Sequence, residues 1–303
     1  MDYQLDFFKG APDEEAIKMI QYYEPLALQY DPRGYCVCTS EGKDSRVLGH
    51  LFRRAGVKHF YMHSITGIDP PELIYFQREK FAEYKSQGYL TYDVMYRKSL
   101  WRMMIEKTIP PIRTIRYCCA ELKERRVEEQ GNALLSFGVR RYESVKRKKN
   151  RRELEIVANG RRGKNIVLPF DNDENRRTFE ICYADCEKRL NPIAEWDNQN
   201  VWDYINYWKL EQCCLYKEGF PRLGCIGCPM TTEANKRKEF RRWPKYRQQY
   251  LWTFNKMIEE RQRRGMPMMG HSSAAEEWFE WWVKDRLSEN KDEQQLELEL
   301  KKM

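Results

Sequence analysis

The sequence predicts an α/β fold built on a doubly wound parallel sheet, followed by a cysteine-bearing, helical C-terminal portion. Two observations predict the sheet: strand-like and helix-like stretches alternate through the first half of the chain, and a glycine-containing loop joins the first strand to the next helix. Strands interleaved with helices favour a parallel sheet that is covered on both faces. A third observation, the rise in cysteine and aromatic content from Phe179 onward, divides the chain into domains 1–178 and 179–303.

The elements are expected in the following order. An amphipathic helix begins near Pro12, because proline suits the first helical position and acidic residues follow it in the first turn. Short apolar or alternating runs predict strands at 34–39, 57–63, 90–95 and 133–139. Amphipathic stretches, with Asp197 as one capping residue, predict helices at 44–54, 70–85, 99–107, 118–129, 197–208, 233–264 and 273–301.

The composition indicates a globular, basic protein. Hydrophobic residues make up 41% of the chain, and the formal net charge of +8 favours acidic partners such as nucleotides or nucleic acid. The alternative is a solvated basic surface, and net charge alone does not decide between the two. No apolar run approaches the roughly 18–20 residues that span a bilayer, and the N-terminus lacks the pattern of a secretory signal. We therefore expect a cytoplasmic protein whose ten cysteines are metal ligands, reactive thiols or core residues rather than disulfides.

A basic segment, 140–164, contains the runs Lys146-Arg147-Lys148-Lys149 and Arg161-Arg162. One interpretation is a solvated loop or hairpin. The other is a lid over phosphates or a nucleic-acid contact. The charge run alone does not decide between them.

The loop 38–45 is the clearest candidate for a binding site. Gly42 lets the backbone approach a phosphate closely, and amides at a helix N-terminus favour negative charge. Lys43 adds a positive charge and Ser45 a hydroxyl donor. The spacing is not that of a Walker A motif, and the alternative is a strand-to-helix turn that binds nothing.

The cysteines suggest a second site. Cys225 and Cys228 form a CxxC turn that Gly227 eases, and two vicinal pairs, Cys118-Cys119 and Cys213-Cys214, precede it. Four thiolates from such segments suit either zinc or a [4Fe–4S] cluster. A thioredoxin-type redox pair and buried free thiols are the remaining alternatives.

Several motifs in sequence order give the chain a family resemblance. Ser-x-Gly-Lys-Asp-Ser at 40–45 resembles the pyrophosphate (PP) loop of the adenine nucleotide alpha-hydrolase-like superfamily. The stretch from about Gly34 to about Thr231 is similar to the phosphoadenosine phosphosulfate (PAPS) reductase family, especially its cluster-bearing branch with the DNA phosphorothioation ATPase. The motifs that carry this second resemblance are Asp69-Pro70-Pro71-Glu72-Leu73, Arg116-Tyr117-Cys118-Cys119 with Leu122-Lys123, Gly138-Val139-Arg140, Asn191-Pro192-Ile193-Ala194-Glu195-Trp196, Val201-Trp202-Asp203-Tyr204-Ile205, and Leu215-Tyr216-Lys217-Glu218-Gly219-Phe220-Pro221-Arg222-Leu223-Gly224-Cys225-Ile226-Gly227-Cys228-Pro229-Met230.

The resemblance implies a set of site residues. It implies a [4Fe–4S] cluster near the nucleotide, with the ligands Cys119, Cys213, Cys225 and Cys228, and with Cys118 and Cys214 as adjacent rivals. It implies a nucleotide-binding domain at 1–178 and a cysteine-cluster and helical region at 179–303. The nucleotide contacts expected from the loop and from the family are Ser40, Gly42, Lys43, Asp44, Ser45, Arg116, Lys123 and Arg140, of which Lys43, Asp44 and Ser45 are the catalytic candidates.

One feature departs from the family's thioredoxin-dependent reductases, which carry a C-terminal nucleophilic cysteine. This sequence has no cysteine after Cys228. Gly-Lys-Asp-Ser is also the form of the loop expected for ATP with its pyrophosphate. We therefore expect ATP-dependent sulfur transfer with Mg2+: an acceptor oxygen attacks the alpha-phosphorus, and sulfur delivered through the cluster then displaces AMP.

The expected partners are an adenine nucleotide, a sulfur donor such as a cysteine desulfurase, and DNA or RNA as an acceptor. Two other functions fit the same residues. The first is a PAPS or adenylyl-sulfate reductase that uses an external thiol. The second is a nucleic-acid-binding regulatory protein on a retired enzyme scaffold, against which the intact loop argues.

Overall fold

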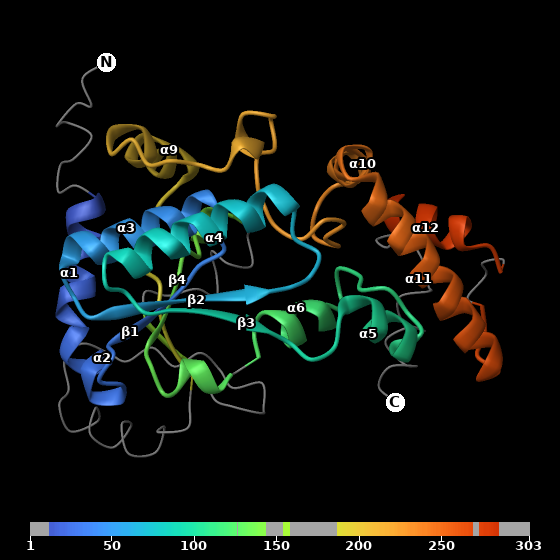
Figure 1. Cartoon of the computed structure of the whole chain (residues 1–303), viewed down its shortest axis with the longest axis horizontal. Helices are drawn as coiled ribbons and strands as arrows, with labels where there is room; N and C mark the ends of the chain where they lie inside the picture. Colours follow the sequence, from blue (N-terminus) through green and yellow to red (C-terminus); the bar gives the residue numbers. More distant parts are fainter. Residues whose placement is uncertain (1–11, 126, 144–153, 158–186, 269–272, 285–303) are drawn as a thin grey trace. The chain divides into compact units, whose positions relative to one another are not determined.

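The computed structural model describes residues 12–125, 127–143, 154–157, 187–268 and 273–284 (Figure 1). Most of the basic segment 140–164, and the expected domain boundary at residue 178, lie outside these residues. The chain forms two compact units, each discontinuous in sequence. The first is Met1–Ser64, Glu72–Val94 and Arg126–Leu223, and the second is Ile65–Pro71, Met95–Arg125 and Gly224–Met303.

The first unit holds a six-stranded sheet in the order β3-β2-β1-β4-β6-β5. The strands are β1 (Tyr35–Cys38), β2 (His59–Ile65), β3 (Thr91–Met95), β4 (Leu135–Phe137), β5 (Leu154–Val157) and β6 (Glu187–Leu190). Strand β1 pairs in parallel with β2 and β4, β4 pairs in parallel with β6, and β5 is antiparallel to β6. Since β6 belongs to this sheet, the first unit extends beyond residue 178.

The strands predicted at 34–39, 57–63, 90–95 and 133–139 are confirmed, whereas α2, β5 and β6 were not predicted. Its helices are α1 (Pro12–Tyr22), α2 (Glu24–Tyr30), α3 (Lys43–Ala55), α4 (Pro71–Ser86) and α9 (Asn198–Tyr207). Helices α1, α3, α4 and α9 contribute to one apolar cluster with Tyr35, Val37 and Tyr61 of the sheet (Figure 1). Cys36 and Phe60, which adjoin these residues in β1 and β2, point to the opposite face because side chains alternate along a strand.

The second unit contains five helices among its described residues. They are α5 (Leu100–Lys107), α6 (Tyr117–Leu122), α10 (Glu233–Arg242), α11 (Pro244–Arg263) and α12 (Ala275–Lys284). Aromatic rings from the last three form its core, with Tyr250 and Trp282 centroids 4.8 Å apart and Phe240 and Phe279 centroids 5.0 Å apart. Within the ranges described, none of the chain's helices is long and apolar enough to cross a bilayer.

Two helix predictions for the second unit were wrong in extent. The single helix expected over 233–264 is broken at Trp243, which has φ −124° and ψ 72°. Pro244 explains the break, because a proline disfavours helical geometry in the residue before it and begins a helix well. The helix expected over 118–129 ends at Leu122, and the next helical residues form a short 3-10 turn, Glu128–Gln130.

Candidate active site

The phosphate-loop candidate lies at the carboxyl end of β1, the centre of the sheet. Successive strands run from β1 outward to β3 on one side, and β4 and β6 lie on the other, so the strand order reverses between β1 and β4. Ligands of open α/β sheets bind in the crevice at such a switch point. The loop and the residues that follow β4 therefore meet where a ligand is expected.

Hydrogen bonds within the loop bring the predicted residues together. The Ser45 hydroxyl donates to the Gly42 carbonyl at 3.0 Å, and the Ser40 amide donates to the Ser45 hydroxyl at 3.3 Å. Gly42 is extended and caps α3, while Glu41 is left-handed with φ 52°. The loop therefore turns sharply into the helix, whose first amides favour an anion.

Positive side chains surround this helix terminus. The Lys43 ammonium lies 2.8 Å from one oxygen of Asp44, and Nε of Arg140 lies 2.8 Å from the other. Lys43 and Arg140 are 5% and 4% exposed. Burial lowers the pKa of Lys43, the Asp44 carboxylate opposes that change, and the positive charges of Arg140 and Arg222 act in the same direction as burial. Lys43 and Arg140 thus pair with the same carboxylate, and the Arg222 charge acts on Lys43, so this helix terminus is a positively charged environment that favours an anion.

Gly138 allows Arg140 to reach the loop. A Cβ at Gly138 would lie 3.0 Å from the Asp44 carbonyl carbon and 3.2 Å from the Ser45 nitrogen. The strand-β4 connection and the first turn of α3 are therefore in direct backbone contact. The family resemblance includes Gly138-Val139-Arg140, and this contact gives the glycine a physical reason.

We expect Gly138→Ala to weaken nucleotide binding about tenfold, or about 1.4 kcal/mol, because the added methyl group displaces the first turn of α3. Gly224→Ala is the matched control, since a Cβ there would meet no described atom within 4 Å and neither glycine has a positive φ. Equilibrium titration with ATP checks the prediction. Equal affinity in the two variants would show that the close approach is unimportant.

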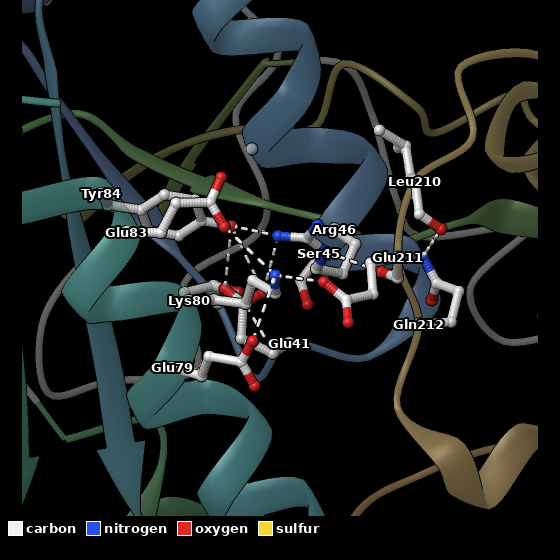
Figure 2. Close-up of polar contacts among 12 residues, drawn as sticks. Glu41, Ser45, Arg46, Glu79, Lys80, Glu83, Tyr84, Leu210, Glu211 and Gln212 are labelled. Atoms are coloured by element: carbon white, nitrogen blue, oxygen red, sulfur yellow. Dashed lines mark hydrogen bonds and ion pairs between the residues drawn. The ribbon is translucent and has the colours of Figure 1, made fainter. Parts of the chain in front are cut away.

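A buried polar cluster supports the loop from inside the first unit (Figure 2). Glu41 is 1% exposed, and its carboxylate lies 3.3 Å from Nη1 of Arg46 and accepts from the Tyr84 hydroxyl at 3.3 Å and the Thr39 hydroxyl at 2.9 Å. Figure 2 shows Lys80 of α4 close by, in ion pairs that are made with Glu79, Glu83 and Glu211. The contacts of Glu41 thus join the loop to Arg46 of α3 and Tyr84 of α4.

Three residues near the loop were missed by the sequence analysis. The hydroxyl of Tyr216 accepts a hydrogen bond from the Lys43 amide at 2.8 Å, and Arg222 contributes charge at Lys43. His63 is 3% exposed at the end of β2, and its Nδ1 lies 2.9 Å from the Thr39 carbonyl oxygen. Its Nε2 has no hydrogen-bond partner within the described part of the chain. Tyr216 and Arg222 stand in the recognised motif, but nothing in their spacing indicated contact with a loop so distant in sequence.

A groove of about 1000 Å³ lies in the same unit. Helices α4 and α9 and the segment 209–217 form its walls, and Cys213, Cys214 and Tyr216 are among the lining residues. Cys213 is buried and Cys214 is exposed. One predicted ligand and its rival therefore lie in the first unit, on the same segment as the tyrosine that contacts the phosphate loop.

The other candidate thiols lie in the second unit. The Cys118 thiol donates to Cys119, which raises the pKa of Cys118 and lowers that of Cys119. Cys118 also interacts electrostatically with Cys225 and Cys228. Burial raises the pKa of Cys225 to about 11. The structure thus brings together four thiols from two distant segments of sequence.

Two of the expected nucleotide contacts, Lys123 and Arg116, are near thiols of the second unit. The interaction with Cys225 raises the pKa of Lys123, and Asp69 and Cys119 act on it in the same direction. Arg116 is close enough to Cys119 to lower its pKa. Asp69 is held in turn by Thr66, whose hydroxyl donates to it at 2.6 Å. The second unit therefore has its own positive charges beside sulfur.

The chemistry of these side chains fits a sulfur-ligated centre, although the ligands do not form a complete set. Within the described ranges, no three histidine, cysteine or acidic residues are grouped so that they could hold a metal ion. All the candidate donors are thiols, the ligands that iron–sulfur clusters and structural zinc share. The assignment of Cys119, Cys213, Cys225 and Cys228 stays a prediction.

The CxxC turn is held in place by the aromatic core of its unit. The Gly227 amide donates to the Glu239 carboxylate at 2.8 Å, and the Tyr250 hydroxyl donates to the Ile226 carbonyl at 2.9 Å. Gly227 has φ +72°, and a Cβ there would lie 2.8 Å from the Trp282 ring and 2.9 Å from the Phe240 ring. Only glycine fits this turn without displacing the rings.

We expect Gly227→Ala to destabilise the second unit by about 1–3 kcal/mol more than Gly265→Ala, because only the first overpacks the core. Gly265 is the matched control, with φ +64° and nothing within 4 Å of its would-be Cβ. Urea unfolding of both variants measures the difference. If the two variants unfold at the same denaturant concentration, the aromatic rings do not constrain the turn.

Comparisons with known proteins identify the family of the chain. Residues 34–231 match the family model of the phosphoadenosine phosphosulfate reductase domain. An uncharacterised protein of Methanocaldococcus jannaschii is 24% identical over 261 residues, which are 84% of this chain and 53% of that protein. The chain spans about half or less of the length of the first curated relatives that it matches.

Two solved structures resemble the chain distantly. Phosphoadenylyl-sulfate reductase from Candida auris, in a phosphate complex, is 14% identical with a TM-score of 0.46 and covers 75% of this chain and 97% of its own. The U34-tRNA thiolase NcsA from Methanococcus maripaludis, with its [4Fe-4S] cluster, is 12% identical with a TM-score of 0.42 and covers 82% and 79%. The family match alone includes the phosphate loop, Arg140 and the CxxC turn, and it extends over more than half of the sequence, so this chain belongs to the phosphoadenosine phosphosulfate reductase family.

Proposed function

We propose that this chain is a sulfur-transfer enzyme that uses ATP and releases pyrophosphate. The observation that carries the proposal is the group of positive side chains at the phosphate loop, where Lys43 and Arg140 pair with Asp44 and Arg222 adds positive charge near Lys43. A triphosphate is an anion that these side chains attract, and its phosphates suit the amides at the start of α3.

The loop residues have distinct roles in this proposal. Lys43 and the loop amides neutralise the charge that develops on the leaving pyrophosphate, and the Ser45 hydroxyl orients the phosphates. An acceptor oxygen attacks the alpha-phosphorus, the bond to the bridging oxygen breaks, and pyrophosphate leaves with the bond's electron pair. A sulfur nucleophile then displaces AMP from the activated acceptor. Asp44 holds Lys43 and Arg140 in position, and it is also a carboxylate that suits Mg2+ bound to the phosphates.

In this proposal, the cysteines are the ligands of the centre that would hold the sulfur. A [4Fe–4S] cluster, when bound, would hold the sulfur before its transfer. Cys225 and Cys228, with Cys118 or Cys119, are the thiols of the second unit that would ligate it, and Cys213 of the first unit is the proposed fourth ligand. A cysteine desulfurase is the proposed donor class, with a reduced thiol supplying the two electrons that convert its persulfide sulfur to the sulfide-level nucleophile. A nucleic acid is one acceptor class that suits a chain of net charge +8.

A second function is favoured by the family itself. A PAPS or adenylyl-sulfate reductase has the same domain but reduces bound sulfate with a thiol, and the matching family model is named for that activity. In this second proposal, an external thiol is the nucleophile that attacks the sulfur of the bound sulfate.

One experiment separates the two functions. Anaerobically purified protein is incubated in parallel with ATP and with PAPS, each with a sulfide source and a reduced thiol, and pyrophosphate and sulfite are both quantified. We expect pyrophosphate and AMP from ATP, and no sulfite from PAPS. Sulfite without pyrophosphate would establish the reductase and overturn the transfer proposal.

A further inference from the structure

The segment that carries Cys213 and Cys214 is attached to the phosphate loop through one side chain. Tyr216 accepts the hydrogen bond of the Lys43 amide at 2.8 Å. This amide is the first of α3, one of the donors that a helix N-terminus offers to an anion. A phosphate oxygen placed against the start of α3 competes with the tyrosine for that donor.

Tyr216 is also part of the structure that holds the cysteines. Its own amide donates to the Cys213 carbonyl at 3.1 Å, and the Lys217 amide donates to the Cys214 carbonyl at 2.9 Å. These bonds form the short turn Cys214–Tyr216. The Tyr216 ring packs edge-on against Trp202 of α9, with centroids 5.3 Å apart. Displacement of the Tyr216 hydroxyl therefore disturbs the turn, because the same residue bonds Lys43 through its hydroxyl and closes the turn through its amide.

We propose that Tyr216 couples occupancy of the phosphate loop to the conformation of the Cys213–Cys214 segment. Ligand binding takes the Lys43 amide from the tyrosine, and the turn that lines the groove of about 1000 Å³ loosens. Coupling is reciprocal, so holding the turn in place opposes ligand binding to the same degree. This inference rests on the proposed nucleotide site and adds a positioning residue to it.

Hydrogen exchange of the peptide 213–220, followed by mass spectrometry, tests the coupling on the full chain. Without ligand, we expect the amides of this peptide to exchange at least about fivefold faster in Tyr216→Phe than in the wild type, because the turn has lost its hydrogen bond to the Lys43 amide. ATP, or inorganic pyrophosphate as the simpler probe, produces the same acceleration in the wild type and none in Tyr216→Phe. The affinity of Tyr216→Phe for either ligand rises by the same factor.

Tyr75→Phe is the matched control. Tyr75 lines the same groove and is 68% exposed, and we expect its variant to respond to ATP as the wild type does. If ligand-free Tyr216→Phe exchanges like the wild type, the inference is overturned whether or not a nucleotide binds. If ATP binds but leaves the exchange of 213–220 unchanged, the coupling is absent and the proposed nucleotide site stands. A third outcome is that Tyr216→Phe exchanges faster than the wild type without ligand, but neither ATP nor pyrophosphate binds. The proposed function then fails, and the proposed coupling fails with it because no ligand occupies the loop.

Discussion

Lys43→Ala is expected to reduce ATP-dependent pyrophosphate release at least about 100-fold, with the fold intact. Removal of one preorganised donor from a site that stabilises developing negative charge costs roughly that factor in other enzymes. Lys43 is 5% exposed and lies 2.8 Å from Asp44, so its position is fixed before any ligand arrives. Initial rates of pyrophosphate release at saturating ATP measure the effect.

A lysine in the same unit provides the control. Lys85 lies at the exposed end of α4, and Lys85→Ala removes the same charge without touching the loop. We expect Lys85→Ala to keep the wild-type rate. If Lys43→Ala released pyrophosphate as fast as Lys85→Ala, or if it left a cellular phenotype intact, the result would support the alternative of a nucleic-acid-binding protein on a retired enzyme scaffold.

Cys225→Ser is expected to remove most of the iron from anaerobically purified protein. The wild type should contain about four irons per chain and absorb as a [4Fe–4S] protein. The serine variant replaces a thiolate ligand by a hydroxyl while the turn around Gly227 keeps its aromatic packing. Iron, sulfide and zinc analysis, together with the absorption spectrum, measures the loss.

Cys38→Ser is the control, because Cys38 lies on β1 and its thiol contacts the Cys36 carbonyl rather than another candidate ligand. We expect it to retain the iron. Parallel Cys118→Ser and Cys119→Ser variants identify which vicinal cysteine ligates. A colourless wild type with one zinc per chain would remove the cluster and weaken the sulfur-transfer proposal.

Most of the first unit could be predicted because its signals are local. Pro12 begins α1, the apolar run before Thr39 is β1, and Asp197 caps α9 with a full capping box. The errors arose where a local signal was weak or was overlooked. Pro244 divides α10 from α11 because it disfavours helical geometry at Trp243. The hydrophobic periodicity continues across this position and therefore predicted one helix.

The site was predictable to the same extent. Ser40, Gly42 and Ser45 come together because they are neighbours in one turn, and the sequence contains that turn. The contacts of Tyr216 with Lys43 depend on tertiary packing between segments 173 positions apart. No periodicity or spacing encodes such a contact, so these residues emerged only from the structure.

The division of the cysteines between the two units also required the structure. From the sequence alone, the four candidate ligands are equivalent, since each belongs to a vicinal pair or to the CxxC turn. They are Cys119, Cys213, Cys225 and Cys228. The fold places Cys213 with the phosphate loop's unit and the other three together in the second unit. Spacing in the sequence does not reveal which unit each thiol belongs to.

Equilibrium titration of the anaerobically purified protein with ATP tests the central claim most directly. The account predicts one ATP bound per chain, competition by inorganic pyrophosphate, and binding at least about tenfold weaker in Lys43→Ala. Absence of saturable binding, or an affinity that Lys43→Ala leaves unchanged, would contradict it.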